Sequence, residues 1–192
     1  QSSKLLLDLR GTARALEVPV EQLASDFLTA QNRIIQLGDR GPDAFDKLSA
    51  AAKGTGISVE GLLGLTSQFD SFESASKMAA SAAAALGTGV FDVMTAMQLR
   101  EEGPAAQIEY LREQILATGM TADKFQQQNT FRQEAIAASF GQDTTTMIKL
   151  LRGEFDELTE SAVEARYTFE EASKEAFGLK GFDAVVTDTM NS

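Results

Sequence analysis

Apolar residues in the first forty positions recur alternately three and four residues apart. This spacing places them along one side of an α-helix, as in the seam of a heptad repeat. The N-terminal seam consists of Leu6, Leu9, Ala13, Leu16, Val20, Leu23, Phe27, Ala30, Ile34 and Leu37. A half-buried β-strand would instead alternate apolar and polar side chains at every second position. The N-terminal region is therefore predicted to be helical, with one apolar face that needs a partner.

Pro19 interrupts this seam. Proline has no main-chain N–H and clashes with the preceding turn, and it also disfavours the helical conformation at Val18. We expect either two helices that meet near residue 18 or one helix with a kink. The seam alone leaves its partner open, because it fits equally well a face packed on its own domain or an intermolecular coiled coil.

A second seam follows near the C-terminus, in a helix predicted over residues 154–177. It consists of Phe155, Leu158, Ala162, Ala165, Phe169, Ala172 and Ala176. Small alanines allow helices to approach closely while the phenylalanines fill the wider gaps, so we predict that this seam joins copies of the chain. The other faces carry eight acidic and two basic residues between Glu154 and Glu175, which is more typical of a solvated face than of a binding site.

Glycine and proline divide the chain between the two seams into short helical segments. Helices are expected over residues 42–53, from residue 58 onward, and over 69–86, 91–99, 104–118, 121–140 and 143–152. Ser58 has the features of an N-cap, with Ile57 and Leu62 placed as a hydrophobic staple. Thr121 has the same features, with Met120 and Phe125 around it.

The predicted fold class is therefore all-α, a multi-helix bundle with short helices and heptad-patterned helices at both ends. Its domains are expected at residues 1–40, 41–153 and 154–192. The chain begins at Gln1 rather than at methionine, which suggests a segment of a longer protein.

The composition argues against most enzyme chemistry. The chain has no cysteine and no histidine, so it lacks the groups used in thiol catalysis, imidazole acid–base catalysis and most transition-metal sites. No arrangement of the remaining Asp, Glu, Ser, Thr, Lys or Tyr residues singles out a catalytic group. We expect no enzymatic activity, no bound metal and no cofactor.

The formal net charge of −11 also argues against some partners. A surface this acidic repels nucleic acid and anionic membranes, so direct nucleic-acid binding is not expected. The longest uncharged stretch, Met78 to Phe91, is too short to span a bilayer, which needs roughly 20 apolar residues.

Two further features resemble sites but have simpler interpretations. The glycine clusters at residues 54–56 and 87–89 follow no predicted strand and lack the Lys-Ser/Thr of a phosphate-binding loop, so they are interpreted as helix C-caps. The paired acids Glu101-Glu102 and Glu170-Glu171 are adjacent and point about 100° apart on a helix, so they are interpreted as solubilising residues.

The stretch from Ile57 to Gly153 nevertheless resembles a known family. Its characteristic blocks are FDSFESA at 69–75, AALGTGVFDVM ending at Met94, EEGPAAQIEYLREQI at 101–115 and RQEAIAASFGQDTTTMIKLLRG at 132–153. Together they are similar to a helical segment of the tail tape measure proteins of tailed bacteriophages. The blocks lie within about half of the chain.

The resemblance implies a non-enzymatic virion protein in the tail tube or at the tail tip, made in the host cytoplasm. It would help to set tail length, take part in assembly and leave ahead of the DNA at infection. Its partners would be copies of itself, tail tube proteins, and baseplate or tail-tip proteins. A single helix of this length spans at most ~290 Å, so these residues would form one region of a longer ruler. The alternative is a cytoplasmic helical adaptor whose seams pack internally and whose groove binds a partner helix.

Overall fold

A computed structural model describes residues 2–153, which fold into ten α-helices and three short 3-10 helices without any β-strand in that range. The predicted all-α class is thus confirmed. The α-helices are α1 Ser2–Ala15, α2 Val20–Ile35, α3 Gly41–Thr55, α4 Val59–Thr66, α5 Phe72–Leu86, α6 Val93–Gln98, α7 Pro104–Ala117, α8 Ala122–Gln127, α9 Thr130–Ser139 and α10 Thr144–Arg152. The 3-10 helices are η1 Gly38–Arg40, η2 Ser67–Phe69 and η3 Leu99–Glu101.

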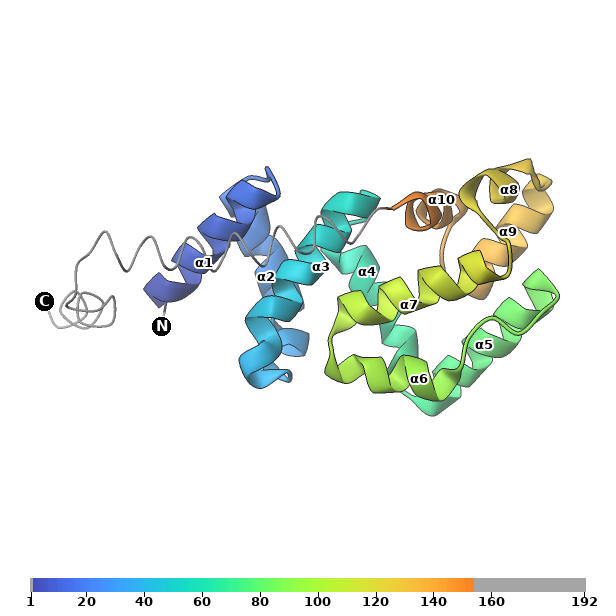
Figure 1. Cartoon of the computed structure of the whole chain (residues 1–192), viewed down its shortest axis with the longest axis horizontal. Coiled ribbons are helices and arrows are strands. Elements are labelled where there is room, and N and C mark those ends of the chain that lie inside the picture. Colours follow the sequence, from blue (N-terminus) through green and yellow to red (C-terminus); the bar gives the residue numbers. More distant parts are fainter. Residues whose placement is uncertain (1, 154–192) are drawn as a thin grey trace, which may run out of the picture.

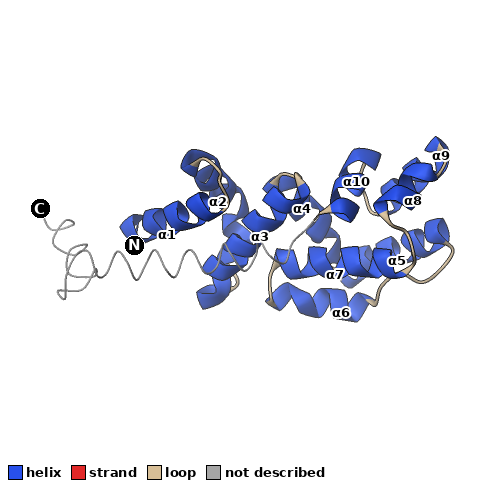
Figure 2. Cartoon of the chain, turned by 45° about the horizontal axis from the view of Figure 1, so that its top comes forward, coloured by secondary structure: helices blue, strands red, loops and turns tan. Residues whose placement is uncertain are grey.

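The helices form an elongated row rather than a sphere (Figure 1). Helices α1 and α2 lie at one end, α3, α4 and α7 lie in the middle, and α8 and α9 lie at the other end. Short loops connect neighbouring helices throughout (Figure 2). Helix α3 packs against α2, and also against α7 and α10, so it joins the N-terminal helices to the rest of the molecule.

The chain forms two helices, α1 and α2, that meet near Pro19. This is the first of the two alternatives that Pro19 left open. Helix α1 ends with main-chain bonds from Val18 N–H to the Ala13 carbonyl and from Glu17 N–H to the Arg14 carbonyl, which together form a Schellman motif. Glu17 takes the left-handed position of this motif, with φ of 52°. Pro19 then has an extended conformation and precedes the first residue of α2, so the break separates two helices instead of kinking one.

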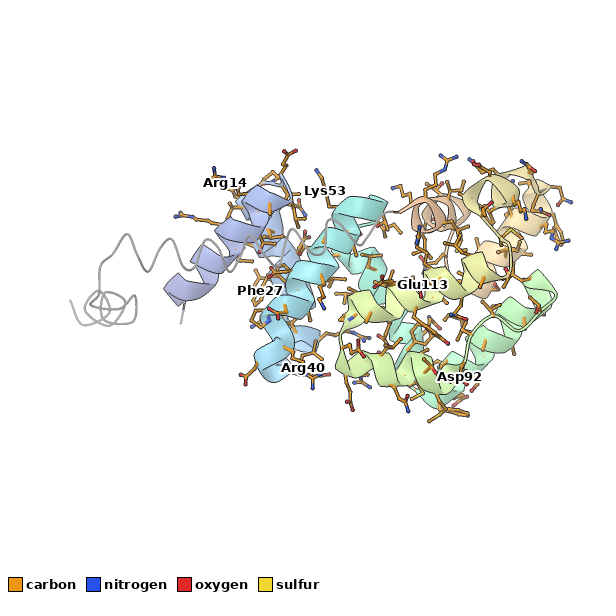
Figure 3. The ribbon with its side chains drawn as sticks, viewed as in Figure 1. Arg14, Phe27, Arg40, Lys53, Asp92 and Glu113 are labelled. Carbon is orange, nitrogen blue, oxygen red and sulfur yellow. The ribbon has the colours of Figure 1, made fainter. Side chains whose placement is uncertain are left out.

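The N-terminal seam packs within its own chain. Its buried members are Leu9, Ala13, Leu16, Leu23, Ala30 and Ile34. Phe27 of α2 extends this contact, because its ring meets the buried ring of Phe45 on α3 edge to face, with centroids 5.1 Å apart (Figure 3 labels Phe27). Of the two partners that the spacing left open, packing on its own domain is the one observed for these residues.

The predicted N-caps in the middle of the molecule are observed. The Ser58 hydroxyl accepts the Gly61 N–H at 3.1 Å and so begins α4, while Ile57 and Leu62 are both buried. The Thr121 hydroxyl accepts the Lys124 N–H at 3.3 Å and begins α8. These hydroxyls satisfy main-chain donors that lack a partner within the first helical turn.

One helix that the sequence predicts is observed as two separate helices. The sequence predicts a single helix over residues 121–140, but α8 ends at Gln127 and α9 begins at Thr130. Gln128 has an extended conformation with ψ of 153°, and the Asn129 side chain accepts the Arg132 N–H at 2.9 Å. The prediction was wrong because the stop is formed by an N-cap inside a glutamine-rich run, without the glycine or proline that marks the other boundaries.

Candidate functional site

The predicted self-association seam lies outside the described residues. Phe155, Leu158, Ala162, Ala165, Phe169, Ala172 and Ala176 all fall in residues 154–192, as does the predicted C-terminal domain.

The glycine clusters end helices, as predicted. Gly56 and Gly87 have φ of 69° and 79°, and their N–H groups donate to the carbonyls of Ala52 and Ala83. A left-handed glycine that closes a helix in this way is a C-cap and not a phosphate cradle. The acidic pair Glu101 and Glu102 is exposed.

Neither a metal site nor a membrane-spanning helix is found in the described residues. Within the described part of the chain, no group of three or more Asp or Glu side chains is arranged to hold a metal ion. In the same residues, no helix is long and apolar enough to cross a membrane.

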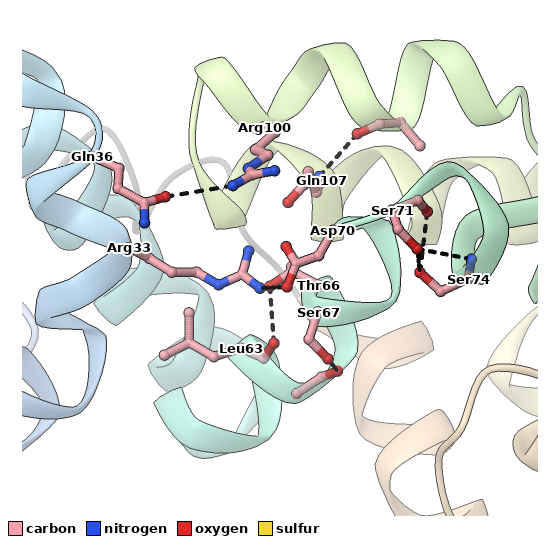
Figure 4. A network of polar contacts seen from close by, with 12 residues as sticks. Arg33, Gln36, Leu63, Thr66, Ser67, Asp70, Ser71, Ser74, Arg100 and Gln107 are labelled. Carbon is pink, nitrogen blue, oxygen red and sulfur yellow. Dashed lines mark hydrogen bonds and ion pairs between the residues drawn. The ribbon is translucent and has the colours of Figure 1, made fainter.

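A polar pocket opens between the end of α2 and the segment from α6 to α7, and Figure 4 shows its lining residues Arg33, Gln36, Arg100 and Gln107. Its volume is about 380 Å³. Its lining consists of Arg33, Gln36, Leu37, Met97, Arg100, Glu101, Pro104 and Gln107. Two arginines and two amides thus surround an apolar wall, a combination that suits a ligand with both polar and apolar parts.

Ion pairs and hydrogen bonds hold the rim of this pocket. Arg33 Nη2 donates to Asp70 Oδ2 at 2.6 Å and ties α2 to the residue after η2. Arg40 Nη1 donates to the Glu101 carbonyl at 3.2 Å and ties η1 to η3. Arg100 Nη2 reaches Gln36 Oε1 only at 3.5 Å, so this guanidinium keeps most of its donor capacity.

Gln107 forms the buried part of the pocket. Its side chain is 1% exposed, and Nε2 donates to the Ala96 carbonyl at 3.0 Å, which joins α7 to α6. The amide oxygen, Oε1, accepts no hydrogen bond from the described residues. An unmet buried acceptor costs roughly 1–3 kcal/mol, so this oxygen favours any donor that enters the pocket.

Two aspartates outside the pocket have perturbed acidity. The Thr95 main-chain N–H, followed by the Thr95 hydroxyl, lowers the pKa of Asp92, and Thr146 lowers the pKa of Asp143 in the same way. Both carboxylates are N-caps, of α6 and α10. Their lowered pKa values reflect helix capping and need no catalytic role.

Large apolar side chains are exposed at separate places on the described helices, namely Leu28, Ile35, Phe72, Met94 and Phe131. Leu28 and Ile35 are 69% and 63% exposed and lie seven residues apart, and hence on one face of α2. Phe131, at the start of α9, is 81% exposed. Such residues mark candidate contact surfaces where they cluster, and single ones are normal.

The polar pocket was not predicted from the sequence. Its walls come from segments far apart in the chain, and Arg33 and Asp70 are 37 positions apart. One signal was present: Gln107 precedes Leu111 and Ile115 by four and eight residues, so a polar residue lies in the register of the buried face of α7.

Comparison with known proteins gives no relative. No family of known proteins, no curated protein and no solved structure matches the chain.

Proposed function

We propose that the chain is a structural segment of a phage tail tape measure protein, located inside the tail tube or at the tail tip. In this role it takes part in tail-length determination, tail assembly and genome ejection. The proposal is carried by one observation, the ordered resemblance of the four sequence blocks between residues 69 and 153.

The positions of those blocks in the fold support the proposal. Many of their apolar residues belong to the core, including Phe69, Ala75, Ile108, Leu111 and Ile136. Helix α5 packs against α6 and α9, so the first two blocks contact the last one. These buried residues are compatible with one helical unit that includes the four blocks.

One observation favours the alternative, a helical adaptor. The N-terminal seam packs internally, as an adaptor requires, and an apolar groove of about 380 Å³ opens beside it, lined in part by Leu16, Val18, Leu23, Ile57 and Val59. Adaptors bind an amphipathic helix in such a groove. The two functions differ in location, since one places the protein in virions and the other in the cytosol.

Quantitative mass spectrometry of purified virions separates these functions. The tape measure function predicts peptides from residues 41–153 in virions at a constant ratio to the tail tube protein, with immunogold label on tails. A cytosolic host protein measured in the same samples controls for contamination. Detection in host cytosol and never in virions would remove the proposal.

The predicted C-terminal seam gives the proposal a second test. If it joins copies, Phe169→Asp places an unpaired charge in the contact and dissociates the assembly at a cost of roughly several kcal/mol. Sedimentation and thermal melting of the full chain measure this, with Tyr167→Asp, off the seam, as the control. A folded monomeric variant supports self-association, whereas an unfolded variant, or a wild type that is monomeric at high concentration, contradicts it.

A further inference from the structure

The polar pocket between α2, η3 and α7 offers an unusual combination of groups. Gln107 provides a buried oxygen that lacks a donor, and Arg100 provides a guanidinium with one long hydrogen bond. Both residues line the same cavity, and Figure 4 shows their side chains. A matching ligand must therefore both donate a hydrogen bond and carry an acceptor or negative charge.

A simple anion does not meet this requirement. A free ionised carboxylate would pair with arginine, but as an acceptor only it would leave the Gln107 oxygen without a donor. The charge balance points the same way, because Asp70 already neutralises Arg33, and Glu101 is a carboxylate in the lining. Among the described residues that line the pocket, Arg100 is therefore the cation that remains for a ligand.

We propose that this pocket binds an acidic residue of a partner polypeptide. The carboxylate pairs with Arg100, which has one long hydrogen bond and no ion pair among the described residues. The main-chain N–H of the same residue donates to Oε1 of Gln107. Its methylene groups contact the apolar wall formed by Leu37, Met97 and Pro104, and the volume of about 380 Å³ accommodates one side chain with its peptide group.

The fold holds this arrangement in place before any ligand arrives. The Gln107 amide is fixed by its bond to the Ala96 carbonyl, which orients the free oxygen. The Arg33–Asp70 pair and the bond from Arg40 to Glu101 connect the two walls. Preformed geometry of this kind lowers the ordering cost of binding.

Nuclear magnetic resonance on the ¹⁵N-labelled full chain tests the proposal. The probe is the capped tripeptide acetyl-Ala-Glu-Ala-amide, and the matched probes are acetyl-Ala-Gln-Ala-amide and glutarate. The acidic peptide should shift the Gln107 side-chain amide and the Arg100 Nε–H signals, with a Kd on the order of 1 mM that rises with salt. The glutamine peptide and glutarate should each bind about tenfold more weakly or not at all.

Variants locate the effect. Arg100→Gln should weaken binding of the acidic peptide about tenfold, because Arg100 is exposed and its loss leaves the core intact. Arg132→Gln, on the exposed surface of α9, is the matched control and should bind normally. Gln107→Met should also weaken binding, with its melting curve recorded because it loses the bond to Ala96.

Three results would overturn the proposal. The Gln107 signal does not move at roughly 10 mM acidic peptide. Glutarate binds as tightly as the peptide, which would make the pocket a site for small carboxylates. Arg100→Gln and Arg132→Gln bind the acidic peptide equally well.

Discussion

Helices α2 and α3, in the N-terminal part of the chain, begin differently from most of the helices that follow. Pro19 and Arg40 precede α2 and α3 without a side-chain capping bond, and these helices have 16 and 15 residues. A side chain caps each of α4, α5, α6, α8, α9 and α10, through Ser58, Ser71, Asp92, Thr121, Asn129 and Asp143.

Helix length accounts for part of the contrast, because the uncapped α-helices α2, α3 and α7 are all long, although α5 has 15 residues and is also capped. Each helix leaves about four N–H groups without an internal partner, whatever its length. In a helix of six residues, such as α6 or α8, these four are most of the N–H groups of the helix. A capping side chain therefore contributes a large share of its stability. A long helix with an apolar face gains its stability mainly from tertiary packing. The N-terminal helices should therefore depend on their seam, and the later short helices on their caps.

The largest expected effect is at the contact between the N-terminal seam and Phe45 of α3. Phe45→Ala should lower the free energy of unfolding by about 3–5 kcal/mol, because Phe45 is buried and packs on Phe27. Phe131→Ala is the matched control, since Phe131 is 81% exposed, and it should change stability by at most about 0.5 kcal/mol. Urea unfolding of both variants measures the difference, and equal losses would contradict the assignment of the seam to the core.

The second-largest loss of stability should come from a change at the junction between the two regions. A Cβ on Gly153 would lie 2.5 Å from Thr55 Cγ2, at the contact of α10 with the end of α3. Gly153→Ala should therefore cost about 1–3 kcal/mol through overpacking. Gly64→Ala, whose Cβ meets no atom within 4 Å on helix α4, should be neutral or stabilising by up to about 1 kcal/mol. Thermal melting of this pair measures how tightly the two regions are joined.

A single cap should have a smaller effect. Asn129→Ala removes the acceptor for the Arg132 N–H and should cost about 1 kcal/mol. Asn32→Ala, an exposed position within α2, should be neutral or slightly stabilising, because alanine favours helix interiors. Hydrogen exchange of the α9 amides provides a local measurement. Unchanged exchange in Asn129→Ala would show that packing, and not the cap, separates α8 from α9.

Lowering the pH should produce the smallest effect on local stability. We expect it in α6 and α10, the helices that aspartate side chains cap. Hydrogen bonds from Thr146 and Thr95 to the carboxylates lower the pKa of Asp143 and Asp92 in the folded state. A lowered folded pKa gives stability that is present above the unfolded pKa of about 4 and is lost as pH falls through the folded pKa. Asp143→Asn keeps a capping oxygen without a titrating group, so α10 exchange should depend less on pH. An identical acid profile in wild type and variant would contradict this.

The boundaries of most helices could be predicted because glycine, proline and capping residues act locally. Gly56, Gly87, Ser58 and Thr121 each determine a helix end within a few residues of themselves. The break at Asn129 was missed because asparagine within a polar run indicates a cap only weakly.

Features that depend on distant contacts could not be predicted from one sequence. The N-terminal spacing identified a buried face, but only the position of Phe45 shows that the partner is the same chain. The polar pocket forms where the side chains of Arg33, Arg100 and Gln107 meet. No sequence pattern around any of them predicts that they lie together. The polar residue in the register of the α7 core face was the single local sign of it.

Tail length is the most direct test of the central proposal. Deletion in frame of residues 41–153 from the parent gene, followed by electron microscopy of the particles, measures it. A ruler predicts intact tails that are shorter, by at most about 170 Å for these residues at 1.5 Å per residue. Tails of unchanged length would contradict the proposal.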